Sequence, residues 1–120
     1  MPYHRLLGIR VIKAENGQSE VWLPFKEELL NAGGIIHGGA LTSLVDATIG
    51  GAVNTVLPEG KFAVTAELNI NFLSACKSGV IGRGKVIRAG RILVVGEAYL
   101  YDEREKLVAA ARATFTVLER

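Results

Sequence analysis

Hydrophobic residues are distributed unevenly along the chain. One run, residues 35–57, is almost entirely apolar or small and contains a single carboxylate, Asp46. Residues 31–39 are rich in glycine and cannot hold a regular element. From Ala40 onward, apolar residues dominate and small residues fill the gaps, which favours a buried helix. We therefore predict a loop that leads into one long helix.

Most of the remaining chain consists of strand-like segments. Residues 1–7 form a lead-in, and residues 26–30 can form one helical turn before the loop. Asn16-Gly17 lies between two strand-like segments and is the strongest short signal for a hairpin. Short connections between consecutive strands indicate antiparallel pairing, because a parallel pair requires a long crossover. The predicted strands are residues 8–14, 19–25, 62–73, 79–89, 92–101 and 107–118.

A sheet of about six strands must bury one face, and the long helix is the only element able to cover it. The sequence therefore predicts an α+β fold, in which a curved antiparallel sheet wraps around a long central helix, in one domain spanning residues 1–120. Gly50 and Gly51 interrupt this helix, at a cost of about 1 kcal/mol each relative to alanine. We expect that another backbone approaches the helix closely at these glycines.

Composition narrows the class of protein. Hydrophobic residues make up 49% of the 120 residues, which is high for a small monomer, so we expect an oligomer. The net charge of +2 comes from mixed acids and bases without a basic run, which argues against a nucleic-acid partner. His37, Asp46 and Asn54 within the apolar run argue against a membrane span. With the single cysteine Cys76 and no signal peptide, we expect a cytoplasmic protein.

Several familiar chemistries lack their motif in this sequence. No serine lies in a G-x-S-x-G pattern, which argues against an α/β-hydrolase nucleophile. Gly82-Arg-Gly84 lacks the third glycine of a dinucleotide-binding motif and lies inside a predicted strand. Two histidines and one cysteine are too few for a zinc site. We therefore expect no metal and no cofactor.

The remaining candidate site combines the glycine-rich loop with the helix carboxylate. At a helix N-terminus, the N–H groups of Gly38 and Gly39 lack intrahelical partners, and the helix dipole helps them to stabilise a developing negative charge. Asp46 is a candidate general base or nucleophile. It lies about 12 Å from Gly38 along the helix, so one carbonyl cannot contact both groups in one chain. The two groups converge only if Gly38 of one chain meets Asp46 of another across a two-fold axis, which predicts an obligate dimer.

Four segments of the chain carry a resemblance to a known family. They are Asn31...Gly34...His37-Gly38-Gly39...Asp46, the segment from Thr65 to Leu73, Gly90-Arg91, and the segment from Leu107 to Phe115. Over roughly residues 20–118 the chain resembles the hotdog-fold acyl-CoA thioesterases of the phenylacetate-degradation type. The resemblance implies hydrolysis of an aryl or medium-chain acyl-CoA substrate to a free acid and CoA. It also implies self-association as a homodimer or a dimer of dimers, that is, a tetramer.

The same resemblance implies a role for each residue of the motif. In that family, the backbone N–H that follows the motif histidine polarises the thioester carbonyl, and Gly38 holds this position. The motif asparagine and histidine, here Asn31 and His37, orient the loop and the thioester. The helix carboxylate, here Asp46, acts from the neighbouring subunit as nucleophile or general base. Thr65 occupies the position of a strand hydroxyl that assists water in some members.

Binding of CoA is less sharply defined by the sequence. Gly39 belongs to the same N–H cradle as Gly38 and is a candidate substrate-binding residue. Arg91 in the Gly90-Arg91 turn and Lys77 beside another turn are candidate contacts for the CoA phosphates. Three further basic residues are also candidate contacts for the CoA phosphates: Arg83, Lys85 and Arg88. The alternative is that they form a solvated basic face. The family usually has a proline where this chain has Ala75-Cys76, which leaves the loop geometry near the CoA entrance open.

Other functions and plain structural roles stay open at this point. A hotdog hydratase or dehydratase pairs a histidine with a nearby acid on another loop, and this chain has no such local pair. A non-catalytic acyl-CoA-binding module normally dispenses with the helix carboxylate, so Asp46 favours an enzyme. Structurally, Asp46 can lie on a wet helix face, Asn31 can cap a turn and Thr65 can simply favour a strand.

Overall fold

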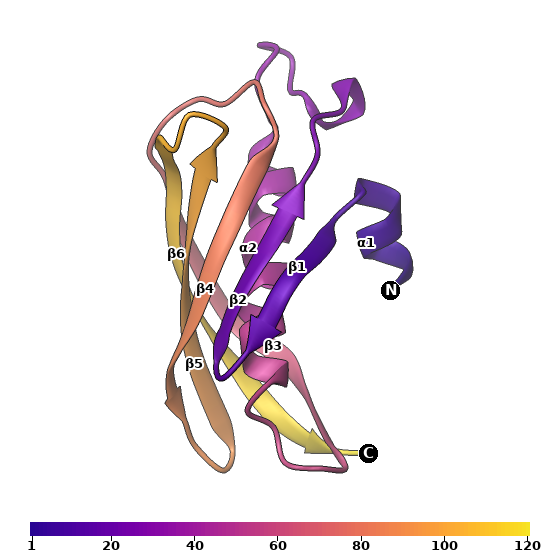
Figure 1. Cartoon of the computed structure of the whole chain (residues 1–120), viewed down its shortest axis with the longest axis vertical. Helices are drawn as coiled ribbons and strands as arrows, with labels where there is room; N and C mark the ends of the chain where they lie inside the picture. Colours follow the sequence, from indigo (N-terminus) through magenta and orange to yellow (C-terminus); the bar gives the residue numbers. More distant parts are fainter.

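A long helix and six strands make up most of the chain in the computed structural model, which describes residues 1–120 (Figure 1). The helices are α1 (Pro2–Leu7) and α2 (Gly38–Asn54), with a 3-10 turn, η1, at Glu27–Leu29. The strands are β1 (Arg10–Glu15), β2 (Gln18–Leu23), β3 (Lys61–Phe72), β4 (Val80–Ala89), β5 (Leu93–Asp102) and β6 (Leu107–Glu119). No helix of the chain has both the length and the hydrophobicity needed to cross a membrane.

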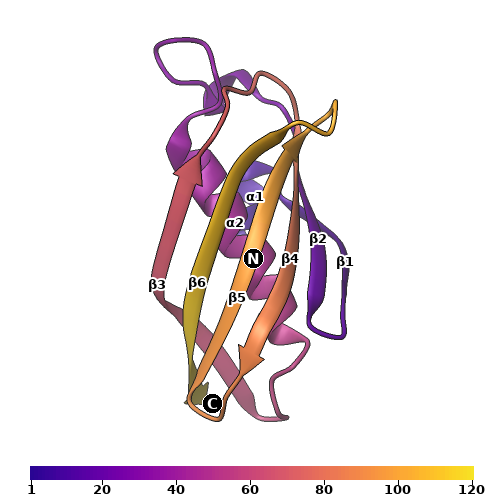
Figure 2. The ribbon, with the colours of Figure 1, turned by 90° about the vertical axis from the view of Figure 1, so that its left-hand side faces the viewer.

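All six strands form one antiparallel sheet in the order β1-β2-β4-β5-β6-β3. Figure 2 shows the sheet from its broad side, with α2 packed behind the strands. The helix contacts every strand of the sheet. The predicted α+β fold, with a curved antiparallel sheet around one long helix, is therefore confirmed. The two edges of the sheet are β1 and β3.

Local sequence signals explain the N-terminal third of the chain. Asn16 (φ 52°) and Gly17 (φ 74°) are both left-handed, as a two-residue hairpin turn between β1 and β2 requires. The lead-in differs from the prediction, because residues 2–7 form α1. Pro2 lies in its first turn and Gly8 (φ 81°) caps its C-terminus, which are favoured positions for these residues. No residue of α1 is buried, so this helix had no apolar periodicity by which to be predicted.

The side of α2 that faces the sheet forms the core with the inner face of the strands. Leu44, Val45 and Ile49 are fully buried there. Thr48 is also buried, and its hydroxyl donates a hydrogen bond to the carbonyl of Leu44 at 2.6 Å. The hydroxyl of Ser19 on β2 donates to the carbonyl of Thr48 at 2.5 Å. This buried pair of bonds fixes the position of α2 along the sheet.

Glycines of the sheet allow α2 to pack closely against it. A Cβ at Gly84 of β4 would lie 2.8 Å from the carbonyl oxygen of Thr48, a distance that real Cβ atoms do not adopt. A Cβ at Gly82 would overlap the side chain of Thr48, and one at Gly96 of β5 would lie 2.7 Å from the side chain of Ile49. Larger residues at these positions would push α2 away from the strands.

The atoms that surround the glycines of α2 differ from those that the sequence predicted. A Cβ at Gly50 would lie 3.6 Å from the ring of Phe115, and one at Gly51 would lie 3.5 Å from the Cβ of Ser19. Both are ordinary contacts, and both are with side chains. The prediction that another backbone approaches Gly50 and Gly51 is therefore wrong within the chain, and the close approach takes place at the sheet glycines instead.

Candidate active site

Asn31 shapes the glycine-rich loop that leads into α2. Its side-chain Oδ1 accepts hydrogen bonds from the N–H groups of Gly33 (2.9 Å) and Ile35 (3.3 Å). Its backbone N–H donates to the carbonyl of Ile35 at 2.8 Å, and its carbonyl accepts from the N–H of Gly34 at 3.0 Å. Asparagine commonly stabilises turns through such local bonds. The Nδ2 group of Asn31 makes no hydrogen bond within the chain and remains available to a ligand.

His37 forms the N-terminal cap of α2. Its Nδ1 atom accepts a hydrogen bond from the N–H of Gly39 at 2.7 Å, so the proton of the neutral ring is on Nε2. The N–H of Gly39 is therefore occupied, although the sequence suggested that it would be free. The N–H of Gly38 has no hydrogen-bond partner in the chain. One free amide donor thus remains at the positive end of the helix dipole.

Gly38 borders a mainly apolar hollow, which we call the Gly38 cleft. The cleft has a volume of about 310 Å³, and Asn31, Leu41 and Cys76 contribute to its lining. Phe72, at the end of β3, is 52% exposed and also lines it. Its ring lies 3.2 Å from the position that a Cβ at residue 38 would take. Glycine at position 38 therefore keeps the free N–H open to a ligand in the cleft.

Asp46 lies two turns further along α2, half-buried and beside β3. The hydroxyl of Thr65 donates a hydrogen bond to Oδ1 of Asp46 at 2.5 Å, whereas Oδ2 has no hydrogen-bond partner. The pairing of β3 with β6 shifts its register between Thr65 and Glu67, which places a bulge at Ala66. Bulges often redirect side chains next to active sites. The structure therefore brings together two of the predicted residues and leaves one carboxylate oxygen free to react.

A second hollow, which we call the Asp46 cavity, lies beside this pair. It has a volume of about 520 Å³ and is lined mainly by residues of α2 and β3, with further residues from α1, β1 and β6. Asp46 and Thr65 contribute polar atoms, while Val64 and Phe115 contribute apolar surface. The Asp46 cavity and the Gly38 cleft have no lining residue in common.

The structure keeps Gly38 and Asp46 apart within one chain. Both residues belong to the same continuous helix, so about 12 Å of helix axis separates them. Each borders its own hollow. A single chain therefore presents the free amide donor and the free carboxylate oxygen at two different places.

The two basic residues predicted to contact CoA also lie apart. Lys77 is exposed in the loop between β3 and β4, next to Cys76 of the Gly38 cleft. Arg91 is exposed in the turn between β4 and β5, at the opposite end of β4 (Figure 1). Neither side chain forms a salt bridge within the chain. Both cations are free to bind a ligand, but one chain does not bring them to one place.

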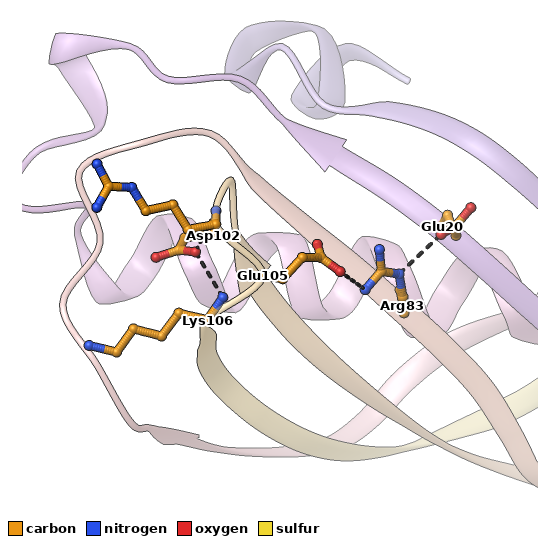
Figure 3. A network of polar contacts seen from close by, with 6 residues as sticks. Glu20, Arg83, Asp102, Glu105 and Lys106 are labelled. Carbon is orange, nitrogen blue, oxygen red and sulfur yellow. Dashed lines mark hydrogen bonds and ion pairs between the residues drawn. The ribbon is translucent and has the colours of Figure 1, made fainter.

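Arg83 is committed to a network on the outer face of the sheet (Figure 3). It lies between two glycines of β4 that face α2, so its side chain points to the opposite side. The guanidinium pairs with Glu20 at 3.1 Å and Glu105 at 3.2 Å, and it lies 5.0 Å from the ring centroid of Tyr101. The hydrogen bonds that Arg83 donates to Glu105 and Glu20 raise the pKa of its guanidinium. Arg83 is therefore a structural cation rather than a free phosphate contact.

Sequence reasoning missed the residues that reach the site from other elements. Phe72 lies in the segment that carries the family resemblance, but no sequence signal places it beside Gly38. Met1 and His4 line the Asp46 cavity from α1, a helix that carried no signal in the hydrophobic pattern. No group of three or more His, Cys, Asp or Glu side chains is placed to hold a metal ion.

The chain is similar in sequence and in structure to known proteins. The family model of the thioesterase superfamily matches residues 33–109, a range that includes Gly38, Asp46 and Thr65. The structure of the conserved protein PA5202 from Pseudomonas aeruginosa has a TM-score of 0.94 at 37% identity, over 98% of this chain and 94% of that chain. Thioesterase HI1161 from Haemophilus influenzae has a TM-score of 0.92 at 27% identity, over 98% of this chain and 82% of that chain. The PaaI protein from the phenylacetic acid degradation operon of E. coli has a TM-score of 0.90 at 25% identity, over 98% of this chain and 85% of that chain.

The match to the family model spans more than half of the chain, and the similar structures extend over nearly all of it. The resemblance inferred from the loop-to-carboxylate spacing is confirmed. The chain belongs to the thioesterase superfamily, and it is a thioester hydrolase with the hotdog fold.

Proposed function

We propose that this thioesterase hydrolyses aryl or medium-chain acyl-CoA thioesters to the free acid and CoA, at sites that two chains share. In each site, the N–H of Gly38 polarises the thioester carbonyl, and Asp46 of the neighbouring subunit acts as nucleophile or general base. The proposal rests on one observation: a free amide donor and a free carboxylate oxygen lie on one helix but border different hollows. A second chain supplies the missing half of each site.

The exposed edge of the sheet supports this association. β3 pairs with β6 on one side only, so its other side presents unpaired backbone groups. Val64, Phe72 and Leu73 on or just after β3 are 42%, 52% and 54% exposed. An exposed apolar edge of this kind favours pairing with another strand. We assign β3 of a second copy, running antiparallel, as that strand.

The side chains along β3 set the register of the proposed pairing. Gly38 lies against Phe72, and Asp46 is bonded to Thr65, so each reacting group has a reference position on the strand. An antiparallel pairing that places Phe72 opposite the partner's Thr65 brings Gly38 towards the partner's Asp46, and the two-fold axis repeats the contact. The axis then passes between positions 68 and 69.

The chemistry follows from these two groups. When the carbonyl carbon becomes tetrahedral, negative charge develops on its oxygen, and the free N–H of Gly38 and the dipole of α2 stabilise that charge. Thr65 holds Oδ1 of Asp46, so Oδ2 either attacks the carbonyl carbon or accepts a proton from the attacking water. Both routes break the C–S bond, and the CoA thiolate leaves and takes a proton. If Oδ2 attacks, the acyl group remains on Asp46 as a mixed anhydride, and water then hydrolyses this anhydride to release the free acid.

The other predicted residues support the same step. His37 caps α2 and so fixes the orientation of the Gly38 N–H. Asn31 holds the loop and offers its free Nδ2 group to the substrate. Lys77, close to the Gly38 cleft, and Arg91, from the far end of β4, are assigned to the CoA phosphates. Gly39 contributes backbone surface to the cradle, because its N–H is already bonded.

Thiol release from a panel of acyl-CoAs tests the reaction. The panel includes phenylacetyl-CoA, hydroxybenzoyl-CoA and straight chains of several lengths. We expect turnover by the wild-type chain and its loss in Asp46→Ala and Asp46→Asn. Full hydrolysis by a folded Asp46→Asn variant would overturn the assigned role of Asp46.

Mixed dimers test the shared site separately. Gly38→Val removes access to the free N–H in one chain, and Asp46→Ala removes the carboxylate in the other. In a heterodimer of these chains, one site carries both defects and the other carries neither. We therefore expect inactive homodimers and partial recovery of activity in the mixture. Proven heterodimers without recovery would refute sharing even if the reaction itself is confirmed.

A further inference from the structure

The Asp46 cavity extends along α2 beyond the reacting carboxylate. Asp46, Gly50 and Asn54 are spaced by four residues, so they lie along one face of the helix, and all three line the cavity. The apolar side chains that line it come from five elements or their ends: Met1, Val11, Ala47, Ala63, Val64 and Phe115. Its volume of about 520 Å³ lies within the range of small-molecule sites. The space beside Asp46 is therefore large enough for an organic group and mainly apolar.

Gly50 keeps this space open on the helix side next to Phe115. Glycine in the middle of a helix is less stable than alanine, and Gly50 does not have a positive φ that would require it. A Cβ at this position would lie 3.6 Å from the ring of Phe115, which is an ordinary contact. Neither the backbone nor the packing of the chain therefore demands glycine here. What glycine provides is room next to a cavity-lining ring.

α1 forms the opposite wall. None of its residues is buried, so it contributes little to the core. The hydroxyl of Tyr3 is hydrogen-bonded to the hydroxyl of Ser43 on α2 at 2.7 Å, one turn before Asp46. This bond holds α1 across the cavity, where His4 and Met1 line it. α1 is thus fastened beside the carboxylate although none of its residues is buried.

We propose that the acyl group of the substrate occupies the Asp46 cavity, between α1 and the Gly50 face of α2, and that Gly50 sets the width of the largest acyl group accepted. This inference rests on the proposed function, because the thioester carbonyl must lie at Asp46 for the acyl group to enter the cavity. The apolar lining suits an uncharged acyl group, and the absence of a side chain at position 50 admits a ring or a branched chain.

Acyl-CoAs of increasing width test this assignment in Gly50→Ala and Gly50→Val. In Gly50→Val we expect the ratio of kcat/KM for phenylacetyl-CoA to kcat/KM for acetyl-CoA to fall roughly 10- to 200-fold relative to the wild type, the usual range for a hydrophobic pocket changed by a methylene or so. Gly50→Ala gives a smaller shift in the same direction. Gly51 also lines the cavity, but Gly51→Ala is a matched control for the change in helix propensity, because its Cβ would point towards Ser19 on β2. We expect its ranking of acyl groups to match that of the wild type.

Three outcomes would overturn the assignment. One is an unchanged ranking of acyl groups in Gly50→Ala, which fits beside Phe115 and stays informative if the valine variant fails to fold. Another is the same shift in ranking in Gly51→Ala. The third is dissociation of the dimer in Gly50→Ala, measured by sedimentation, because Gly50 would then serve packing between chains. Failure of the proposed function looks different: acetyl-CoA hydrolysis then survives Asp46→Ala, whatever the Gly50 variants do.

Discussion

The hydrogen bond between Thr65 and Asp46 offers the sharpest test of how the carboxylate is oriented. Thr65→Val removes the donor to Oδ1 while keeping the shape of the side chain and its preference for a strand. A hydrogen bond to a charged group is worth about 1.5 to 3 kcal/mol. Thr65 is exposed and Asp46 is half-buried, so the low end of that range applies. Because about 1.4 kcal/mol corresponds to a tenfold change in rate, we expect kcat to fall roughly tenfold.

The split between kcat and KM distinguishes orientation from substrate binding. Loss of an oriented carboxylate lowers kcat and leaves KM nearly unchanged, whereas loss of a substrate contact raises KM. Initial rates of thiol release over a range of acyl-CoA concentrations give both constants. Thr65→Ser retains the hydroxyl and should recover most of the activity. Wild-type kcat in Thr65→Val, or no recovery in Thr65→Ser, would refute the role assigned to this hydrogen bond.

Three further variants test the scaffold around the site. His37→Ala removes the cap of α2 and should cost about 1 kcal/mol of stability in thermal unfolding, whereas His37→Asn retains an acceptor and should cost little; equal stability of both variants would contradict the capping role. Gly84→Ala should lower the free energy of unfolding by about 2 to 4 kcal/mol, because the added Cβ overpacks against the Thr48 carbonyl and disturbs its hydrogen bond with Ser19. Urea titrations measure this loss, and a wild-type unfolding midpoint would refute the close contact. Arg83→Met should lower the free energy of unfolding by at most about 1 kcal/mol per ion pair, and by less at high salt. The variant should keep thioesterase activity, and a loss of turnover would reassign Arg83 to the site.

Most of the fold could be predicted because its signals are local. The apolar run with Asp46 is too long for a strand, and the Asn16-Gly17 turn fixes the first hairpin by its own backbone preference. α1 could not be predicted, since none of its residues is buried and they follow no helical hydrophobic period. The pattern that identifies a helix reports burial, and this helix has no buried residue.

The site was predictable to the extent that its groups lie on one element. The spacing of Gly38 and Asp46 follows from the sequence and the helix rise, and the family resemblance adds Thr65, which the structure places on Asp46. The capping of Gly39 by His37 depends on a side-chain rotamer that no spacing reveals. The commitment of Arg83 to two carboxylates likewise depends on strands that are distant in the sequence.

Because of the sheet glycines, the faces of α2 differ in how well they tolerate substitution. Where Gly84 and Gly96 meet Thr48 and Ile49, no methyl group can be added without displacing the helix, so that side has almost no freedom to mutate. On another face of the helix, at Gly50, a Cβ would make only an ordinary contact with the ring of Phe115. New residues can therefore accumulate on the open side while the helix stays in place. In evolutionary terms, the helix carries its fixed and its variable positions on separate faces, and a change of substrate need not begin with a change of fold.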